Sequence, residues 1–206
     1  MNFFPWLLFL LLGAVGCLTT SCASTKPNTT PNPFGVRISH TNEVLRVELN
    51  GRLFTEYHYT NTPRPFCYPI IGPGAVAMTR NYPMLTNAPA EERDHPHHRS
   101  LWFAHGAVNG QDLWAEGKAS GRIVHRGFAE ILSGTQSGTI KTLNDWVDKD
   151  GKVLCTDEQT IQFYSPQDDV IWLDFEIKLR ASNGDLTLGD TKEGSFAIRI
   201  AAYISP

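Results

Sequence analysis

The segment VIWLDFEIKLR, residues 170–180, decides the fold class of this chain. Apolar and polar side chains alternate along it, and the apolar set is Ile171, Leu173, Phe175, Ile177 and Leu179. Successive side chains of an extended strand point to opposite faces of a sheet, so a period of two places the whole set on one face. The segment therefore predicts a β-strand with one buried face.

Turn signals between alternating segments predict β-hairpins elsewhere in the chain. Asn50-Gly51 favours the positive φ angles of a type I′ turn, and it separates the alternating residues 45–49 from the extended segment RLFTEYHY, residues 52–59. A second turn, Asp-Lys-Asp-Gly at residues 148–151, lies between two further extended segments, 139–147 and 152–164. Recurring hairpins indicate antiparallel pairing.

The fold class expected from these patterns is all-β, as an antiparallel β-sandwich or a large twisted sheet. No segment combines the helical spacing of apolar residues with helix caps. Seven prolines between Pro63 and Pro96 exclude long central strands from residues 60–114, so we expect loops, turns and edge strands there. A length of 206 residues suits one domain, which we place at residues 35–206.

Residues 1–22 are expected to be an export signal. Residues 3–15 are apolar and uncharged, and small polar residues around Cys17 and Cys22 follow them. The pattern resembles a bacterial lipoprotein signal, with Cys22 as the preferred lipidated residue and a flexible tether at residues 23–34. An ordinary cleaved signal and an uncleaved anchor are the alternatives. The chain is then periplasmic or lipid-anchored at the cell envelope, and it meets the membrane only through its signal or anchor.

Charge and cysteine content narrow the expected partners. The chain has 18 basic and 21 acidic residues and no basic run that would neutralise a phosphate backbone, so nucleic acid is not an expected partner. Export would place Cys67 and Cys155 in an oxidising compartment, where they could pair as a disulfide or stay as buried thiols. Their separation in sequence does not decide between these states.

The candidate site lies in residues 93–114, RDHPHHRSLWFAHGAVNGQDLW. Four of the seven histidines of the chain fall in an eleven-residue span there: His95, His97, His98 and His105. On an extended segment His95 and His97 would point the same way, and His105 could return from a neighbouring strand, which would suit a metal ion. The spacing matches no recognised zinc pattern, so the cofactor is left unknown.

Acid–base chemistry or ligand binding is the second interpretation of this stretch. Asp94 could raise the pKa of a neighbouring histidine and fix its tautomer. Arg99 could bind a carboxylate or a hydroxyl pair, and Trp102 or Trp114 could stack on a sugar ring. In a purely structural interpretation, Asn109 for example belongs only to a turn. Three other histidines fall on predicted strands and are assigned no role: His40, His58 and His125.

Three blocks of sequence resemble a known family. They are residues 93–114, YPIIGPGAVAMTRNYPM at residues 68–84, and GDTKEGSFAIRIA at residues 189–201. In this order they are similar to a bacterial family of unknown function often labelled methane oxygenase PmoA-like, over residues 35–201. The methane monooxygenase subunit of that name crosses the membrane several times, whereas this chain has one apolar segment. The chain is therefore not expected to be that subunit.

The resemblance implies an exported β-sandwich similar to galactose mutarotase, and a carbohydrate that it binds or transforms. It also implies a longer domain, so we expect a truncated chain in which the strand at residues 196–200 has no later partner. The candidate catalytic residues are His95, His97, His98 and His105. The candidate substrate-binding residues are Asp94, Arg99, Trp102, Asn109, Asp112 and Trp114. The alternatives left open are a non-catalytic carbohydrate-binding or cell-surface module and a metal-dependent site.

Overall fold

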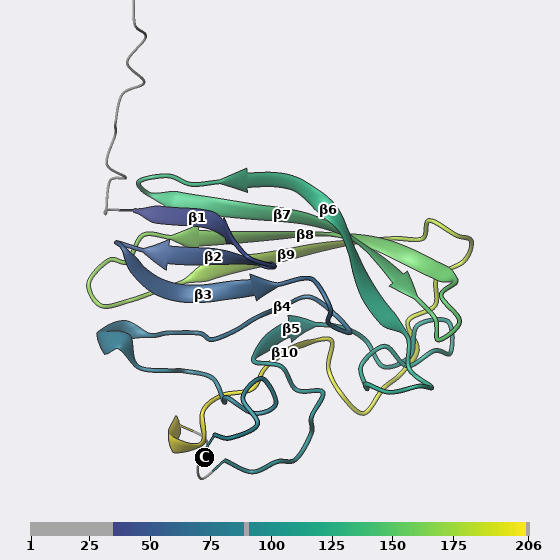
Figure 1. Ribbon diagram of the computed structural model, residues 1–206. Helices are drawn as coiled ribbons and strands as arrows, with labels where there is room; N and C mark the ends of the chain where they lie inside the picture. Colours follow the sequence, from purple (N-terminus) through teal and green to yellow (C-terminus); the bar gives the residue numbers. More distant parts are fainter. Residues whose placement is uncertain (1–34, 89–90, 205–206) are drawn as a thin grey trace, which may run out of the picture. The chain divides into compact units, whose positions relative to one another are not determined.

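The computed structural model describes residues 35–88 and 91–204, which form an antiparallel β-sandwich (Figure 1). One sheet has the strand order β1-β2-β3-β4-β5-β10, with bounds Val36–Thr41, Val44–Leu49, Arg52–His58, Phe66–Cys67, Leu101–Phe103 and Phe196–Ile198. The other has the order β6-β7-β8-β9, with bounds Arg122–Leu132, Ser137–Val147, Val153–Tyr164 and Leu173–Arg180. Two short 3₁₀ helices complete the described elements, Pro73–Ala75 and Ala202–Ile204. The all-β prediction is confirmed, and the predicted signal and tether lie outside the described residues.

The predicted hairpins are present. Asn50 and Gly51 have φ angles of 49° and 76° between β2 and β3, as a type I′ turn requires. The long hairpin β7–β8 places Ile140 opposite Ile161, and β9 adds to β8 with Phe175 opposite Ile161. The segment that decided the fold class is thus the edge strand of the four-stranded sheet, and its apolar face is half-buried while its polar face is exposed.

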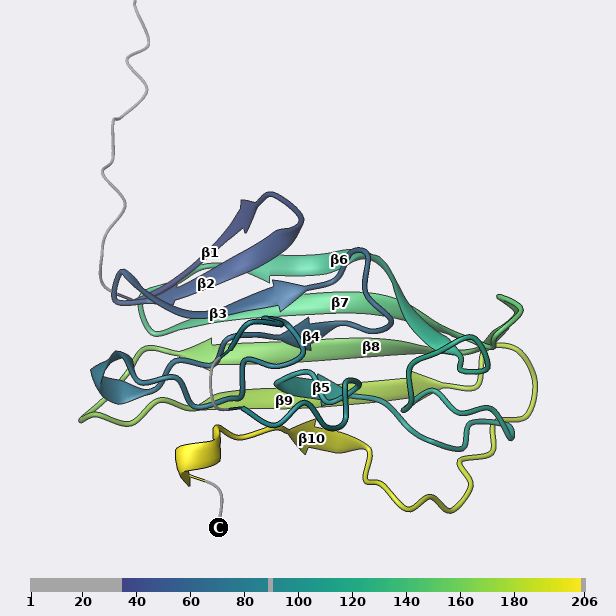
Figure 2. The same cartoon turned by 60° about the horizontal axis from the view of Figure 1, so that its bottom comes forward.

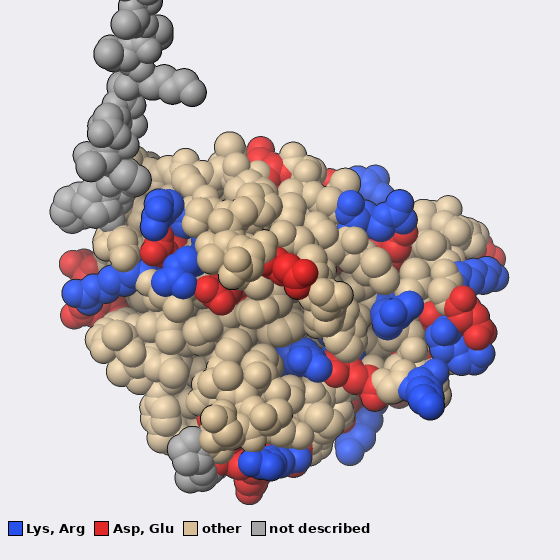
Figure 3. Space-filling model, in the orientation of Figure 1, with Lys and Arg blue, Asp and Glu red and all other residues tan. Residues whose placement is uncertain are grey.

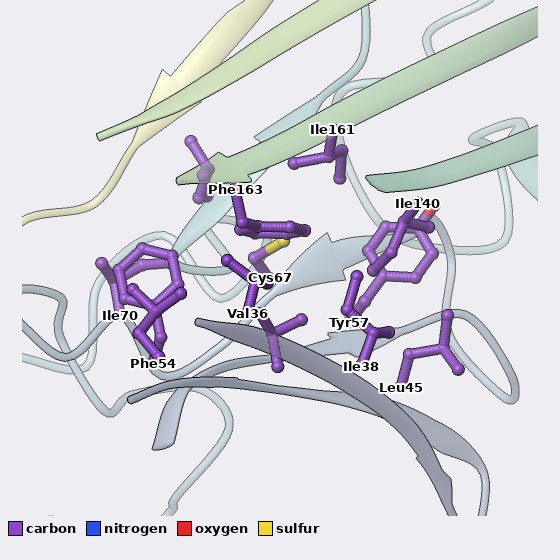
Figure 4. Packing of buried hydrophobic residues seen from close by; sticks show 13 residues of the cluster. Val36, Ile38, Leu45, Phe54, Tyr57, Cys67, Ile70, Ile140, Ile161 and Phe163 are labelled. Atoms are coloured by element: carbon purple, nitrogen blue, oxygen red, sulfur yellow. The ribbon is translucent and has the colours of Figure 1, made fainter. Parts of the chain in front are cut away.

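The first hydrophobic core lies between β1–β3 and the long strands β7 and β8. Figure 4 shows side chains of the two sheets pointing toward one another, with Ile161 and Phe163 on one side and Val36 and Phe54 on the other. Phe54 and Phe163 meet edge to face, with ring centroids 6.0 Å apart. Alternation along most of β7 and β8 supplies this layer, because every second residue points inward there.

A second core supports the middle of the chain. It is formed by Trp102, Leu113, Trp114 and Trp146 with smaller neighbours, and each of these four side chains is at most 5% exposed. Residues 60–121 hold only β4, β5 and one 3₁₀ turn among their described residues, as the prolines predicted. Buried indole rings thus pack beneath this region, alongside its scattered backbone hydrogen bonds.

Strand β10 is an edge strand of the six-stranded sheet. It pairs with β5, which precedes it in the chain (Figure 2). The pairing is short because Ile198 is already opposite Leu101, the first residue of β5. Phe196 and Ile198 keep exposed fractions of 51% and 49%, and Phe196 contacts Phe175 of the other sheet at a ring distance of 5.2 Å.

The charges on the surface are mixed, as the near balance of basic and acidic residues predicts. On the face shown in Figure 3, basic and acidic side chains are interspersed, without a large patch of one sign. Cys67 and Cys155 are both buried free thiols, and burial raises their pKa values to about 12 and about 11. Within residues 35–88 and 91–204 we find no helix long and apolar enough to cross a bilayer.

Candidate functional site: a histidine turn beside a doubly anchored aspartate

The sequence HPHH folds into a tight turn that gathers three imidazole rings. The backbone N–H of His98 donates to the carbonyl of His95 at 2.9 Å, which closes the turn. His95 has a φ of 46°, an uncommon value for a residue with a side chain. The ring centroids of His95 and His98 lie 4.7 Å apart and nearly parallel, and His97 meets His98 edge to face at 4.5 Å. We call His95, His97 and His98 the histidine turn.

Asp94 is the electrostatic centre beside this turn. Its carboxylate accepts hydrogen bonds from Arg80 at 2.5 Å, from Arg199 at 2.9 Å and from Nδ1 of His95 at 2.6 Å. The hydrogen bond with His95, followed by those with the arginines, holds the pKa of Asp94 well below its ordinary value. An ionised carboxylate only accepts, so His95 carries a proton on Nδ1, and in the neutral form of the ring Nε2 is the acceptor.

Two segments far apart in sequence bring the arginines together. The N–H of Arg80 donates to the carbonyl of Arg199 at 3.0 Å, and Thr79 pairs with Ile200 in an isolated β-bridge. We did not single out either arginine from the sequence. Both arginines lie in the blocks that carry the family resemblance, and these blocks were the only indication of their importance. No local pattern indicated that the two arginines would meet Asp94.

The other two rings of the histidine turn are neutral at neutral pH. Burial, with the neighbouring His97 and His95, lowers the pKa of His98 to about 4. Burial, with Arg64 and His95, also lowers the pKa of His97. Nε2 of His98 is buried and has no hydrogen-bond partner among the described residues. Its ring lies against Trp102 and Trp114, at centroid distances of 5.3 and 5.8 Å.

Arg99 points into an internal ion-pair cluster. Its Nε and Nη2 atoms each donate to Glu116 at 2.7 Å, so its fork is already filled by a carboxylate. The same carboxylate lies 3.5 Å from Arg64, whose side chain is 1% exposed. Burial lowers the pKa of Arg64 to about 10, and Glu116 opposes this shift. Neither Arg64 nor Glu116 was predicted from the sequence.

Arg64 ties the histidine turn to the loop that follows β5. Its Nη1 donates to the carbonyl of His97 at 3.0 Å, and its Nη2 donates to the carbonyls of Trp114 and Ala115 at 2.6 and 3.1 Å. Three carbonyls from two loops thus share one buried guanidinium. The Arg64–Glu116 pair therefore positions the turn instead of contacting a ligand from solvent.

Among the remaining predicted site residues, the polar ones make hydrogen bonds within the protein and the two tryptophans are buried. His105 is within hydrogen-bond distance of Ser195 Oγ and the Gly189 carbonyl, both at 2.9 Å, so both ring nitrogens are occupied. Oδ1 of Asn109 accepts from the Thr187 N–H at 2.7 Å. Asp112 accepts from two backbone N–H groups of its own turn. Trp102 and Trp114 are 2% and 5% exposed, so neither offers a free ring face to a sugar.

The described residues hold no group of three or more His, Cys, Asp or Glu side chains arranged to bind a metal ion. The structure thus brings together Asp94 and the three residues of the histidine turn, and adds Arg80 and Arg199. It places His105 and the other predicted residues in the supporting scaffold around them.

Comparisons with known proteins identify a family without a function. A family model described as a family of unknown function, DUF6807, matches residues 44–205, and the chain belongs to this family. Neither the curated proteins nor the solved structures gave a match to the chain. Any activity must therefore be argued from the site itself.

Proposed function

We propose that this member of the DUF6807 family binds or transforms a carbohydrate at the histidine turn, with His95 as the acid–base group. The observation that carries the proposal is the 2.6 Å hydrogen bond between Asp94 and Nδ1 of His95. An imidazole oriented by a carboxylate, with its second nitrogen unprotonated, is the arrangement that general bases use. His95 has a side chain that is 49% exposed, so a ligand in solution can reach it.

In the proposed reaction, Nε2 of His95 removes the proton of an anomeric hydroxyl as the ring C–O bond breaks, and the imidazolium then gives this proton to the released ring oxygen. Asp94 stabilises the imidazolium that forms in between, and the two arginines keep Asp94 ionised throughout. His97 and His98, neutral at the same pH, supply further hydrogen-bonding nitrogens beside the hydroxyl. The carbohydrate as substrate class rests on the resemblance described above.

A metal-dependent site is the second candidate. Neutral imidazole is the form that binds a metal ion, and the low pKa values of His97 and His98 favour that form. A carboxylate that holds Nδ1 of a histidine is also the usual outer partner of a metal-binding imidazole. Because the rings do not form a ready site as they lie, this function would need the turn to rearrange.

Four variants test these alternatives: His95→Gln, Asp94→Asn, His98→Gln, and His40→Gln as a control on β1. Binding to soluble neutral and acidic oligosaccharides is measured by calorimetry, and turnover by release of reducing ends and by change in optical rotation. Acid–base catalysis predicts that His95→Gln removes turnover while binding persists. A non-catalytic module predicts binding without turnover in the unaltered protein. Equal turnover in His95→Gln and His40→Gln would refute the role of His95.

Metal analysis separates the second candidate from the first. The protein is incubated with zinc or copper, passed through a desalting column and measured by elemental analysis. One equivalent of metal that is lost in both His95→Gln and His98→Gln supports the metal site. Turnover that survives chelation, in a protein without bound metal, supports the acid–base function.

The cellular location is part of the same proposal, because an extracellular carbohydrate requires export. Residues 1–22 act as the signal, and Cys22 carries the lipid. Metabolic labelling with a palmitate analogue tests this: Cys22→Ser should abolish incorporation, whereas Cys17→Ser should leave it intact. Labelling that persists in Cys22→Ser contradicts the choice of residue.

A further inference from the structure

A row of polar side chains crosses the core between the two sheets, away from the histidine turn. Thr142 and Asn144 point inward from β7, and Asp157 and Gln159 point inward from β8. Each is at most 2% exposed. A buried carboxylate is costly unless hydrogen bonds compensate for its lost hydration, so its partners need an explanation.

Asp157 receives three hydrogen bonds. Asn144 Nδ2 and Trp146 Nε1 donate to it at 2.6 Å each, and Gln159 Nε2 donates at 3.0 Å. Burial raises the pKa of Asp157, and these three donors oppose that shift. Because all three partners are donors, the Asp157 carboxylate acts as the acceptor at the inner end of the row.

Hydrogen bonds are donated inward along the row, from His125 toward Asp157. Since Asn144 donates through Nδ2, its Oδ1 is left to accept, and the Thr142 hydroxyl makes a long contact with it at 3.5 Å. The Thr142 oxygen is also 2.7 Å from Nδ1 of His125. A hydroxyl that gives its proton to Asn144 must accept from His125, so the proton of His125 lies on Nδ1. This direction of donation leaves Nε2 of a neutral His125 ring as the acceptor.

His125 is only partly buried, and it lines a pocket of about 570 Å³ beside β6. The other lining residues are Tyr59, Thr60, Asn61, Thr62, Pro63, Arg122 and Val124. The ring of Tyr59 lies 4.7 Å from that of His125. Arg122 is exposed, and among residues 35–88 and 91–204 no carboxylate lies within 4.0 Å of its guanidinium.

These features specify the chemistry of a ligand. No acidic residue lines the pocket, and the neighbouring Glu43 carboxylate already accepts hydrogen bonds from Thr60 and Asn61, so the open guanidinium of Arg122 favours an anion. An arginine with an open fork suits a carboxylate, a tyrosine ring suits the apolar face of a small ring, and an imidazole acceptor suits a hydroxyl. None of the residues of the histidine turn lines this pocket.

We propose that this pocket is a second ligand site, which binds a small hydroxylated carboxylate such as a sugar acid. Arg122 binds the carboxylate, Tyr59 contacts the ring, and Nε2 of His125 accepts a hydrogen bond from a hydroxyl. The buried row positions His125 by favouring one tautomer. Without the row, the ring could carry its proton on Nε2, and that nitrogen could then no longer accept a hydrogen bond from a hydroxyl.

The tautomer is tested first, by long-range ¹H–¹⁵N correlation spectra of the histidine rings. The unaltered protein should show His125 as neutral Nδ1–H. Thr142→Val removes the acceptor while keeping the shape of the side chain, and should move His125 toward Nε2–H. Thr139→Val, on the outer face of the same strand, is the matched control and should leave the spectrum unchanged. A His125 that is Nε2–H in the unaltered protein overturns the proposal.

Binding is tested by titrating glucuronate, with glucose as the uncharged control, while the His125 and Tyr59 resonances are followed. Saturable shifts with glucuronate and none with glucose are expected, and Arg122→Gln should weaken glucuronate binding roughly tenfold or more, as loss of a charge-assisted hydrogen bond implies. His95→Gln should leave this binding unchanged. No saturation up to the solubility of glucuronate, equal binding of glucose, or loss of binding in His95→Gln would each overturn the second site. The last outcome alone would assign glucuronate to the histidine turn.

Discussion

Replacing Glu116 by glutamine should destabilise the protein far more than removing a carboxylate from an exposed ion pair. Glu116 is the shared counter-charge of Arg99, at 2.7 Å, and of Arg64, at 3.5 Å. In Glu116→Gln the guanidinium of Arg64, 1% exposed, stays buried without a carboxylate. Breaking a buried ion pair from one side costs about 3–5 kcal/mol. Since Arg99 is 22% exposed and the glutamine oxygen still accepts one hydrogen bond, we expect about 3 kcal/mol.

The loss is measured by urea unfolding followed by circular dichroism. With a slope of about 2 kcal/mol per molar urea, the midpoint should fall by about 1.5 M. The thermal midpoint should fall by roughly 6–12 °C. Glu176→Gln is the control, because its partner Lys178 is 50% exposed and such surface pairs contribute about 0–1 kcal/mol.

Two results would refute this reasoning. If the free energy of unfolding changes by less than about 1 kcal/mol, Arg64 is hydrated or neutral in the folded state and needs no counter-charge. If Glu176→Gln costs as much as Glu116→Gln, the effect is one of net charge and not of the buried pair. A confirmed loss should also broaden the His97 and His98 resonances, because Arg64 holds the carbonyl of His97.

Three further predictions follow from the titrating groups and the thiols. His98 has a pKa of about 4 in the folded protein and near 6.5 in the unfolded chain, so the unfolded state binds more protons between these values. The free energy of unfolding should therefore fall as the pH is lowered through this range. His98→Gln should flatten this pH dependence, as measured by urea titrations at pH 4.5 and 7. The depressed pKa of Asp94 contributes stability above about pH 4 that is lost as the pH falls further, so Asp94→Asn should lack this acid-dependent component; an unchanged acid limb would contradict the arginine contacts. Cys67 and Cys155 should resist iodoacetamide at pH 8 in the folded protein and react after unfolding, as mapped by mass spectrometry; fast labelling of either would show that its site is open.

The local pattern of the sequence was enough to predict the strands and hairpins. Alternation in residues 170–180 corresponds to β9 from Leu173 onward, and Asn50-Gly51 forms the turn between β2 and β3. These features depend on the backbone geometry of a few neighbouring residues, so they can be read without knowledge of the rest of the chain. The prolines of residues 60–114 likewise predicted a region of loops.

The composition of the site was only partly predictable. The cluster of histidines in the sequence indicated where the turn lies, and the predicted contact between Asp94 and a neighbouring histidine is present as its hydrogen bond with His95. The predicted ligand contact of Arg99 is replaced by a pairing with Glu116, seventeen residues later, and the predicted stacking of Trp102 is replaced by burial. A sequence records that an arginine and two indoles are present, but burial depends on what packs over them.

The sequence by itself determined the all-β class, the hairpins and the position of a histidine-rich loop, because alternation and turn residues specify the backbone over only a few neighbouring residues. Only the tertiary structure decided which charges meet. Arg80 and Arg199 reach Asp94 from 14 and 105 residues away, and Asp157 orients His125 through two intervening side chains on β7. Hydrogen bonds and ion pairs act within about 3–4 Å in space, and no local pattern encodes which distant segments the packing of two sheets will place that close.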